Sequence, residues 1–215
     1  VRSEDAAQSL QEIANAENLQ IELIRADVSM DKGREHLVAE VLNRAEALHG
    51  IVFAAATGVH RTMDTLSARH FDFVFSLNVR AYLLLVQALL PRLASGSCII
   101  ALSSEGAGRV MQHYGLVSAS KAALEAMSRQ WAVELAPRGI RANVLSPGAV
   151  RTDAWLALPN ADARLAAASE ATPRGTLITL QEVARTAQFL CSDAASGINA
   201  QTIVVDGGAR DRGSI

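Results

Sequence analysis

Residues 97–148 read SCIIALSSEGAGRVMQHYGLVSASKAALEAMSRQWAVELAPRGIRANVLSPG. Their first part, 97–104, is an apolar run that ends in hydroxyl side chains, and 140–148 is another apolar run, closed by Pro147-Gly148. A helical pattern over about 115–135 separates the two. Strands that are apolar on both faces and alternate with helices are typical of a parallel sheet covered on both sides. The stretch therefore predicts a strand–helix–strand unit.

The same alternation continues on both sides of this stretch. Further strands are expected at 21–28, 49–58 and 201–208, and helices at 3–17, 31–48, 68–94 and 180–192. Because each crossover between parallel strands is right-handed by default, the pattern predicts a doubly wound, Rossmann-like α/β sheet. Residues 1–215 are interpreted as one domain, since no internal repeat or Pro- or Ser-rich linker interrupts the pattern.

The composition excludes several classes of protein. Half of the 215 residues are hydrophobic, which excludes a disordered chain. The formal net charge is −2, and a chain without a basic excess is not expected to bind nucleic acid. Cys98 and Cys191 are far apart and form no CxxC pair, so neither a metal site nor a disulfide framework is expected. No apolar run approaches the roughly 20 residues of a membrane span, so no membrane partner is expected.

Small, polar and glycine residues gather where the predicted strands end. They are Asp27, Ala55–Gly58, Ser103-Ser104 and Pro147-Gly148. In a doubly wound sheet the carboxyl ends of the strands border the crevice that holds the ligand. The sequence therefore predicts a cofactor site at this edge of the sheet.

Several ordered motifs resemble the short-chain dehydrogenase/reductase family. They are the stretch 102–153, Leu77-Asn78-Val79 and the terminal VVDGG at 204–208. The usual Tyr-x3-Lys is absent, because Val117 stands four residues before Lys121; Tyr114 instead gives Tyr-x6-Lys. Seven residues are two helical turns, so both side chains can still face one crevice. This spacing and the stretch 54–85 resemble type III enoyl-acyl-carrier-protein reductases, and about 151–178 is similar to their substrate-covering segment.

The resemblance implies roles for four catalytic residues. Tyr114 would donate a proton, and Lys121 would bind the nicotinamide ribose and make Tyr114 more acidic, because a nearby cation favours the phenolate. Ser104 would contact the substrate or the cofactor near the nicotinamide. Asn78 would order the lysine and a water through its helix.

The resemblance also implies a set of cofactor-binding residues. They are Asp27 and Val28 beside the adenine, Ala55, Ala56 and Gly58 in the loop after a strand, and Gly148, Val150 and Thr152 around the nicotinamide carboxamide. At Arg2-Ser3 no acidic residue is present to hold a ribose 2′-hydroxyl, which favours NADP(H) over NAD(H). The family's glycine-rich phosphate turn is not in the chain, so the resemblance implies an N-terminally incomplete domain that lacks a βαβ portion of roughly 30–40 residues before Val1.

The activity implied is NADPH-dependent reduction of the C=C bond of an enoyl thioester, carried by acyl-carrier protein or CoA. Hydride addition places negative charge on the thioester oxygen, which a phenol stabilises before a proton completes the reduction. Two alternatives stay open: a ketoreductase or alcohol dehydrogenase acting on a ketone or 3-oxoacyl substrate, which needs the same parts, and a non-catalytic relative that does not bind a cofactor. No metal is expected.

The resemblance further implies fatty acid biosynthesis, a cytoplasmic location and a homo-oligomer, either a dimer or a tetramer. A stripe at helical spacing, formed by Leu124, Met127, Trp131 and Leu135, is interpreted as core or subunit interface. Arg61 and Arg109 are interpreted as a solvated face rather than a docking site for an acidic carrier, and His113 as a polar residue flanking Tyr114.

Overall fold

The computed structural model describes residues 4–156 and 160–210. Its strands are β1 (Leu48–Phe53), β2 (Leu93–Leu102), β3 (Arg141–Pro147) and β4 (Thr202–Val205). Its helices are α1 (Glu4–Ala16), α2 (Asp31–Arg44), α3 (Ala68–Phe75), α4 (Ala81–Leu89), α5 (Gly115–Leu135), α6 (Asp153–Leu156), α7 (Ala161–Ala171) and α8 (Leu180–Cys191). A π-helical turn, Ser76–Arg80, joins α3 to α4.

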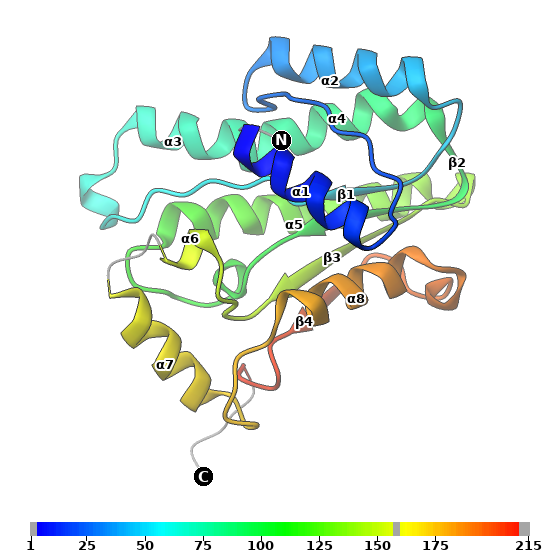
Figure 1. Cartoon of the computed structure of the whole chain (residues 1–215). Helices are drawn as coiled ribbons and strands as arrows, with labels where there is room; N and C mark the ends of the chain where they lie inside the picture. Colours follow the sequence, from blue (N-terminus) through cyan, green and yellow to red (C-terminus); the bar gives the residue numbers. More distant parts are fainter. Residues whose placement is uncertain (1–3, 157–159, 211–215) are drawn as a thin grey trace.

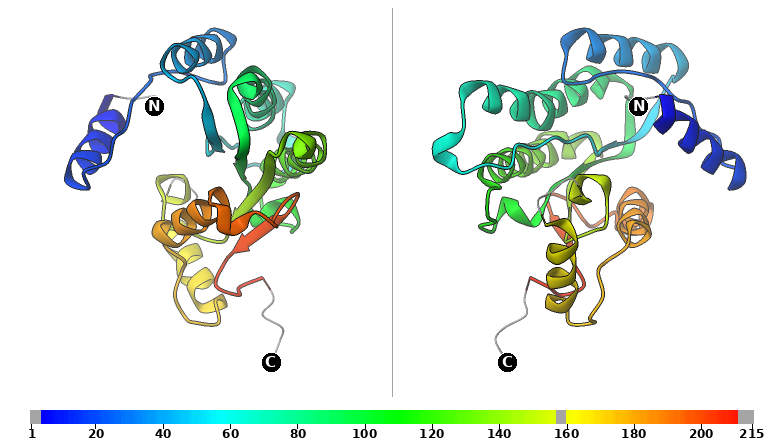
Figure 2. Two further views of the ribbon diagram at one scale, coloured as in Figure 1. Left: turned by 90° about the vertical axis from the view of Figure 1, so that its right-hand side faces the viewer. Right: turned by 60° about the vertical axis from the view of Figure 1, so that its left-hand side comes forward.

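The four strands form one parallel sheet in the order β1-β2-β3-β4, with helices on both faces (Figure 1). Helices α4 and α5 cover one face and α8 covers the other (Figure 2). The predicted α/β sheet with helices on both faces is therefore confirmed.

Alternate residues of β2 belong to two different cores, as the period of a strand requires. Ile99 and Ala101 pack with α4 and α5, whereas Cys98 and Ile100 pack with α8. We call these the α5-side core and the α8-side core. Since both faces are buried from Ser97 onward, residues 98–102 of β2 form a continuous apolar run, which is why the strand could be recognised from the sequence.

Local signals set the ends of the helices that carry the fold. Helix α5 is followed by a 3₁₀ turn and by Gly139, whose φ of 71° lies in the left-handed region that glycine adopts freely. Helix α8 begins with a capping box, in which the Thr179 hydroxyl accepts from the Glu182 backbone and the Glu182 carboxylate accepts from Thr179.

The crossovers do not all have the same hand. The chain passes from β2 to β3 through α5 and from β3 to β4 through α8, moving in the same direction across the sheet. Because α5 and α8 lie on opposite faces, these two crossovers have opposite hands. The expectation that every crossover is right-handed is therefore wrong. The crossover whose hand is opposite to that of the β2–β3 connection is the β3–β4 connection, which also carries α6 and α7.

The strand expected at 21–28 does not form. Residues 21–27 have no regular structure, and no other segment within 4–156 and 160–210 pairs with them as a strand. Asp27 instead accepts hydrogen bonds from the backbone and hydroxyl of Ser29 at 3.0 and 2.6 Å. A β-branched apolar run becomes a strand only beside a neighbour that completes its hydrogen bonds.

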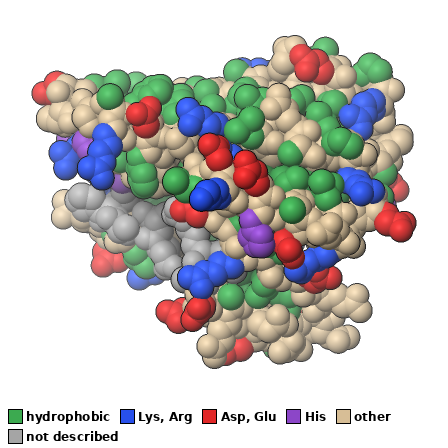
Figure 3. All heavy atoms as spheres, turned by 90° about the horizontal axis from the view of Figure 1, so that it is seen from above, with side chains coloured by type: hydrophobic (Ala, Val, Ile, Leu, Met, Phe, Trp, Pro, Cys, Tyr) green, Lys and Arg blue, Asp and Glu red, His purple; other side chains and the backbone are tan. Residues whose placement is uncertain are grey.

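The helical stretch Ala68–Arg92 is long and apolar enough, by length and composition alone, to cross a membrane. The side chains of Ala81, Tyr82 and Val86 in this stretch are completely buried in the α5-side core. A core helix passes the same composition test, and burial of this kind identifies the stretch as one. On the face shown in Figure 3, positive and negative side chains are interspersed, in keeping with the near-neutral net charge.

Candidate active site

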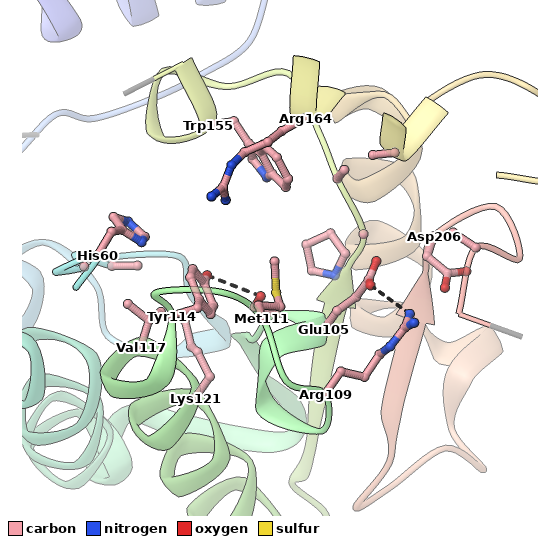
Figure 4. A pocket seen from close by; sticks show the side chains of 18 of the residues that line it. His60, Glu105, Arg109, Met111, Tyr114, Val117, Lys121, Trp155, Arg164 and Asp206 are labelled. Atoms are coloured by element: carbon pink, nitrogen blue, oxygen red, sulfur yellow. Dashed lines mark hydrogen bonds and ion pairs between the residues drawn. The ribbon is translucent and has the colours of Figure 1, made fainter. Parts of the chain in front are cut away.

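Tyr114 stands at the first turn of α5, beside a cavity at the carboxyl ends of the strands. Its carbonyl accepts the first hydrogen bond of the helix, from Ser118 at 2.8 Å. The cavity has a volume of about 350 Å³. It brings together six of the residues predicted from the sequence: Ser104, Tyr114, Lys121, Ala56, Gly58 and Gly148. Trp155 of α6 and Arg164 of α7 face Tyr114 and Lys121 from the opposite side (Figure 4).

The Tyr114 hydroxyl donates a hydrogen bond to Ser104 Oγ at 3.4 Å. Burial raises the pKa of Tyr114, and the bond to Ser104 lowers it by less. The expectation that Lys121 makes Tyr114 more acidic is not met here, because burial raises the pKa of Tyr114 and only Ser104 opposes that change. A tyrosine with a raised pKa keeps its proton at neutral pH, which is the state that a proton donor needs.

Lys121 lies two turns further along α5 and points into the same cavity. The side chain is almost fully buried, and Nζ donates to the Leu102 carbonyl at 2.7 Å. Burial lowers the pKa of Lys121 to about 8, and the nearby Glu125 carboxylate opposes that change. An ammonium group has three N–H donors, so Lys121 has donors to spare for a ligand beyond the one bound to Leu102.

Asn78 does not line the cavity but joins two elements that do. It lies in the π-helical turn and is fully buried. Its Oδ1 accepts from the Thr57 backbone at 2.8 Å, and its Nδ2 donates to the Thr57 carbonyl and to Ser120 Oγ, both at 2.9 Å. Asn78 therefore fastens the loop after β1 to α5, the helix of Lys121, which is a positioning role.

Two glycines of the cavity wall pack closely against neighbouring side chains of the protein. A Cβ on Gly58 would lie 2.9 Å from Val117 Cγ2, and one on Gly148 would lie 2.7 Å from Glu105 Oε1. Both glycines line the cavity, as Ala56 does. Small residues thus let the wall of the cavity pack closely, and the spare N–H donors of Lys121 point into it. A cavity at the carboxyl ends of the strands with free N–H donors fits the nicotinamide ribose of a dinucleotide.

Five of the predicted cofactor residues do not line the cavity: Asp27, Val28, Ala55, Val150 and Thr152. Val150 is buried in the α8-side core. Thr152 Oγ1 instead accepts a hydrogen bond from the Trp155 backbone at 3.3 Å, at the start of α6. Ala55 and Val28 pack against the α5-side core. Arg2 and Ser3 lie outside the described residues.

Several cavity residues were missed by the sequence analysis, and three of them carry side chains that face the site: His60, Trp155 and Arg164. The His60 imidazole stacks on the Tyr114 ring, with the ring centroids 5.5 Å apart and 26° between the planes. Partial burial, and then the Arg164 guanidinium, lower the pKa of His60. No local spacing marks these residues, since they come from a loop and two short helices that meet only in the folded chain. The one available signal was Trp155, a single tryptophan in an alanine-rich stretch.

Glu105 and Arg109 form an ion pair in the cavity wall at 3.4 Å. Burial raises the pKa of Glu105, and Arg109 lowers it by less. Arg109 therefore has an acidic partner within the protein. His113 is exposed, with a φ of 59°, and Arg61 is exposed as well, so the interpretation of these two as polar surface residues agrees with the structure.

We expect Gly106→Ala to lower the turnover number by about 10-fold, because it displaces the Tyr114 ring. A Cβ at Gly106 would lie 2.6 Å from both Cδ1 and Cε1 of Tyr114. Steady-state kinetics with a saturating thioester would measure the change. Gly108→Ala is the matched control, because a Cβ there meets no atom within 4 Å. Equal turnover in the two variants would contradict the close contact.

The parallel sheet and the Tyr–Lys–Ser cavity at its carboxyl edge define an oxidoreductase of the short-chain dehydrogenase/reductase type. The family model described as enoyl-(acyl carrier protein) reductase matches residues 1–210. The chain belongs to this family, as the motifs predicted.

Individual relatives agree with the family. A 1-cyclohexenylcarbonyl-CoA reductase of Streptomyces collinus is 33% identical over 187 residues, which is 86% of this chain and 67% of the relative. Protein FixR of Bradyrhizobium diazoefficiens is 40% identical over 162 residues, which is 74% of this chain and 56% of the relative. The crystal structure of an NADH enoyl-(acyl-carrier-protein) reductase from Aquifex aeolicus superposes with a TM-score of 0.90 at 28% identity, covering 100% of this chain and 85% of that one.

The expectation of NADP(H) is wrong. The enoyl reductases of Aquifex aeolicus, Haemophilus influenzae and Enterococcus faecalis to which the chain is similar are all named as NADH enzymes. The expectation depended on Arg2-Ser3, where no acidic residue is present to hold a ribose 2′-hydroxyl. The lack of an acidic side chain at two positions does not exclude NADH, because other polar groups can accept the hydrogen bonds of the hydroxyl.

Proposed function

We propose that this protein reduces the C=C bond of an enoyl thioester with NADH. The observation that carries the proposal is the placement of Tyr114 and Lys121 two helical turns apart in α5, both facing the cavity at the carboxyl ends of the strands. The enoyl reductases among the relatives support the same reaction type.

Each polar side chain of the cavity has a separate role in the proposed reaction. Bound NADH supplies the hydride. The Tyr114 hydroxyl donates a hydrogen bond to the thioester oxygen and stabilises the negative charge that develops there. In this structure the single Tyr114 proton is donated to Ser104 Oγ at 3.4 Å, so it turns from Ser104 to the thioester oxygen when substrate binds. Lys121 uses its spare N–H donors to hold the nicotinamide ribose.

We propose that the segment at about 151–178 covers the substrate. Trp155, Arg164 and Ala168 of this segment line the cavity on the side away from α5. Residues 157–159 lie outside the described part of the chain. Closing an apolar cover over the thioester excludes water, which strengthens the hydrogen bond from Tyr114 to the enolate.

The test compares two substrates under one cofactor. Loss of NADH absorbance is followed with a crotonyl thioester and with an acetoacetyl thioester. Oxidation of NADH with the crotonyl thioester supports the proposal. Turnover of the acetoacetyl thioester alone would replace it with the ketoreductase alternative, and failure to bind NADH at all would favour the non-catalytic relative.

The carrier and the assembly are part of the same proposal. Relatives are named for both acyl-carrier-protein and CoA substrates, so the crotonyl group is tested on each carrier. A homo-oligomer, a dimer or a tetramer, stays a prediction that light scattering on the purified protein can check. A single domain over residues 1–215, a cytoplasmic location and a place in fatty acid biosynthesis stay predictions as well.

A further inference from the structure

The two cysteines of the chain, far apart in sequence, meet in the α8-side core. Cys98 lies in the middle of β2, and Cys191 is the last residue of α8. Both are free thiols in one buried cluster, and each lies near enough to shift the pKa of the other. This contact joins a strand to a helix on the face of the sheet that α8 covers.

Arg141 places a positive charge beside the pair. It is the partner of Cys98 on the neighbouring strand β3. Its Nη2 donates to the carbonyls of Leu190 at 2.9 Å and Ser192 at 3.3 Å, the two residues on either side of Cys191. A hydrogen bond from one thiol and a nearby guanidinium both stabilise a thiolate. The neighbouring Cys98 thiol and the Arg141 guanidinium lower the pKa of Cys191, while the neighbouring Cys191 and burial raise the pKa of Cys98.

The two sulfurs differ in access as well as in charge. Cys98 is completely buried, whereas Cys191 is only partly buried. The space around the inner sulfur is provided by Gly50 of β1, where a Cβ would lie 3.1 Å from Cys98 Sγ. A small reagent therefore reaches Cys191 first. Cys98 lies behind it and is the only other thiol of the chain that could react with a modified Cys191.

We propose that Cys191 and Cys98 form a redox-active dithiol, in which Cys191 reacts with a peroxide and Cys98 resolves the product as an intramolecular disulfide. The Cys191 thiolate attacks one oxygen of hydrogen peroxide, the O–O bond breaks, and Cys191 sulfenic acid and hydroxide result. The Cys98 sulfur then attacks the Cys191 sulfur, the S–O bond breaks, and water leaves with the proton of Cys98. In total, both thiols are oxidised and one peroxide is reduced to two waters.

The disulfide would tie α8 to β2 and would close a long loop of the chain. Such a bond restricts the unfolded chain more than the folded one, so the oxidised protein should unfold at a higher temperature than the reduced protein. The pair lies among the residues of the α8-side core and does not line the cavity. The inference is therefore independent of the reaction proposed for Tyr114 and Lys121.

The test treats the native protein with hydrogen peroxide and follows thiols, mass and oligomeric state. We expect both thiols to disappear, the intact mass to fall by two hydrogen atoms and the chain to remain free of intermolecular bonds on a non-reducing gel. Dithiothreitol should restore both thiols. In Cys98→Ser, and equally in Cys98→Ala, Cys191 should stop at sulfenic acid and react with dimedone. In Cys191→Ser, the remaining thiol should resist peroxide while the protein is folded.

Several results would overturn the proposal. Disulfide-linked dimers of the wild-type protein would show that the thiols pair between chains. Dimedone labelling of wild-type Cys191 at the level of Cys98→Ser would show that Cys98 does not resolve the sulfenic acid. Oxidation of Cys98 in Cys191→Ser as fast as that of Cys191 in Cys98→Ser would remove the order of reaction that the structure assigns.

Discussion

Replacement of Tyr114 by phenylalanine should lower kcat for an enoyl thioester by about 100-fold and leave NADH binding within a factor of a few. The variant loses the one hydroxyl that donates to Ser104 and keeps the ring that stacks on His60. The shape of the cavity is thus preserved while the donor to the enolate is removed. Steady-state kinetics give kcat, and the change in NADH fluorescence on binding gives Kd.

Tyr82→Phe is the matched control, since Tyr82 is the only other tyrosine in the chain. Its hydroxyl is also buried, but it bonds to Ser128 Oγ at 2.9 Å in the α5-side core and is not part of the cavity. This variant should lose about 1 kcal/mol of stability and keep its turnover. Unchanged kcat in Tyr114→Phe, or equal losses in the two variants, would remove Tyr114 from the reaction.

Replacement of Lys121 by methionine should weaken NADH binding about 10-fold and lower kcat/KM by about 100-fold. Methionine fills much of the buried space but cannot donate to a ribose or to the Leu102 carbonyl. Fluorescence titration with NADH measures the first effect and initial rates measure the second. Lys32→Met is the control, because Lys32 is the only other lysine and lies exposed on α2.

The same residue predicts a pH dependence of binding. Burial gives Lys121 a pKa of about 8 in the free protein, so its charge is lost as the pH rises through that value. The negatively charged dinucleotide favours the protonated amine, so binding takes up a proton and the affinity for NADH should fall as the pH rises through about 8. In Lys121→Met this dependence should disappear. The same pH dependence in wild type and variant would assign it to another group.

The sequence predicted those parts of the site whose geometry depends only on residues close together in the chain. The two-turn spacing of Tyr114 and Lys121 depends only on the period of one helix, and that helix was recognisable from its own pattern over about 115–135. The segment 21–28 was mispredicted because strand formation depends on a neighbour that its own residues do not reveal. Residue composition indicates only a tendency to form a strand, and hydrogen bonding to a neighbouring strand decides whether the strand forms.

The stack of His60 on Tyr114 and the contact of Cys98 with Cys191 were beyond the reach of sequence patterns for another reason. Each pair joins elements that are distant along the chain, and no periodicity connects their positions. The sequence predicts neither a metal site nor a disulfide framework, because the two cysteines are far apart and form no CxxC pair. In the folded protein their meeting follows from the register of β2 and β3 and from the point at which α8 ends.

The amide of Asn78 also determines which parts of the site can open together. The Thr57 N–H lies in a loop, yet its hydrogen is bound to Asn78 Oδ1 in the interior, and the same side chain holds Ser120 of α5. For that hydrogen to exchange with solvent, the π-helical turn has to open, and its hydrogen bonds to Thr57 and Ser120 have to break. The loop after β1 and the helix that carries Lys121 thus belong to one cooperative unit of local unfolding, in spite of the irregular backbone of the loop.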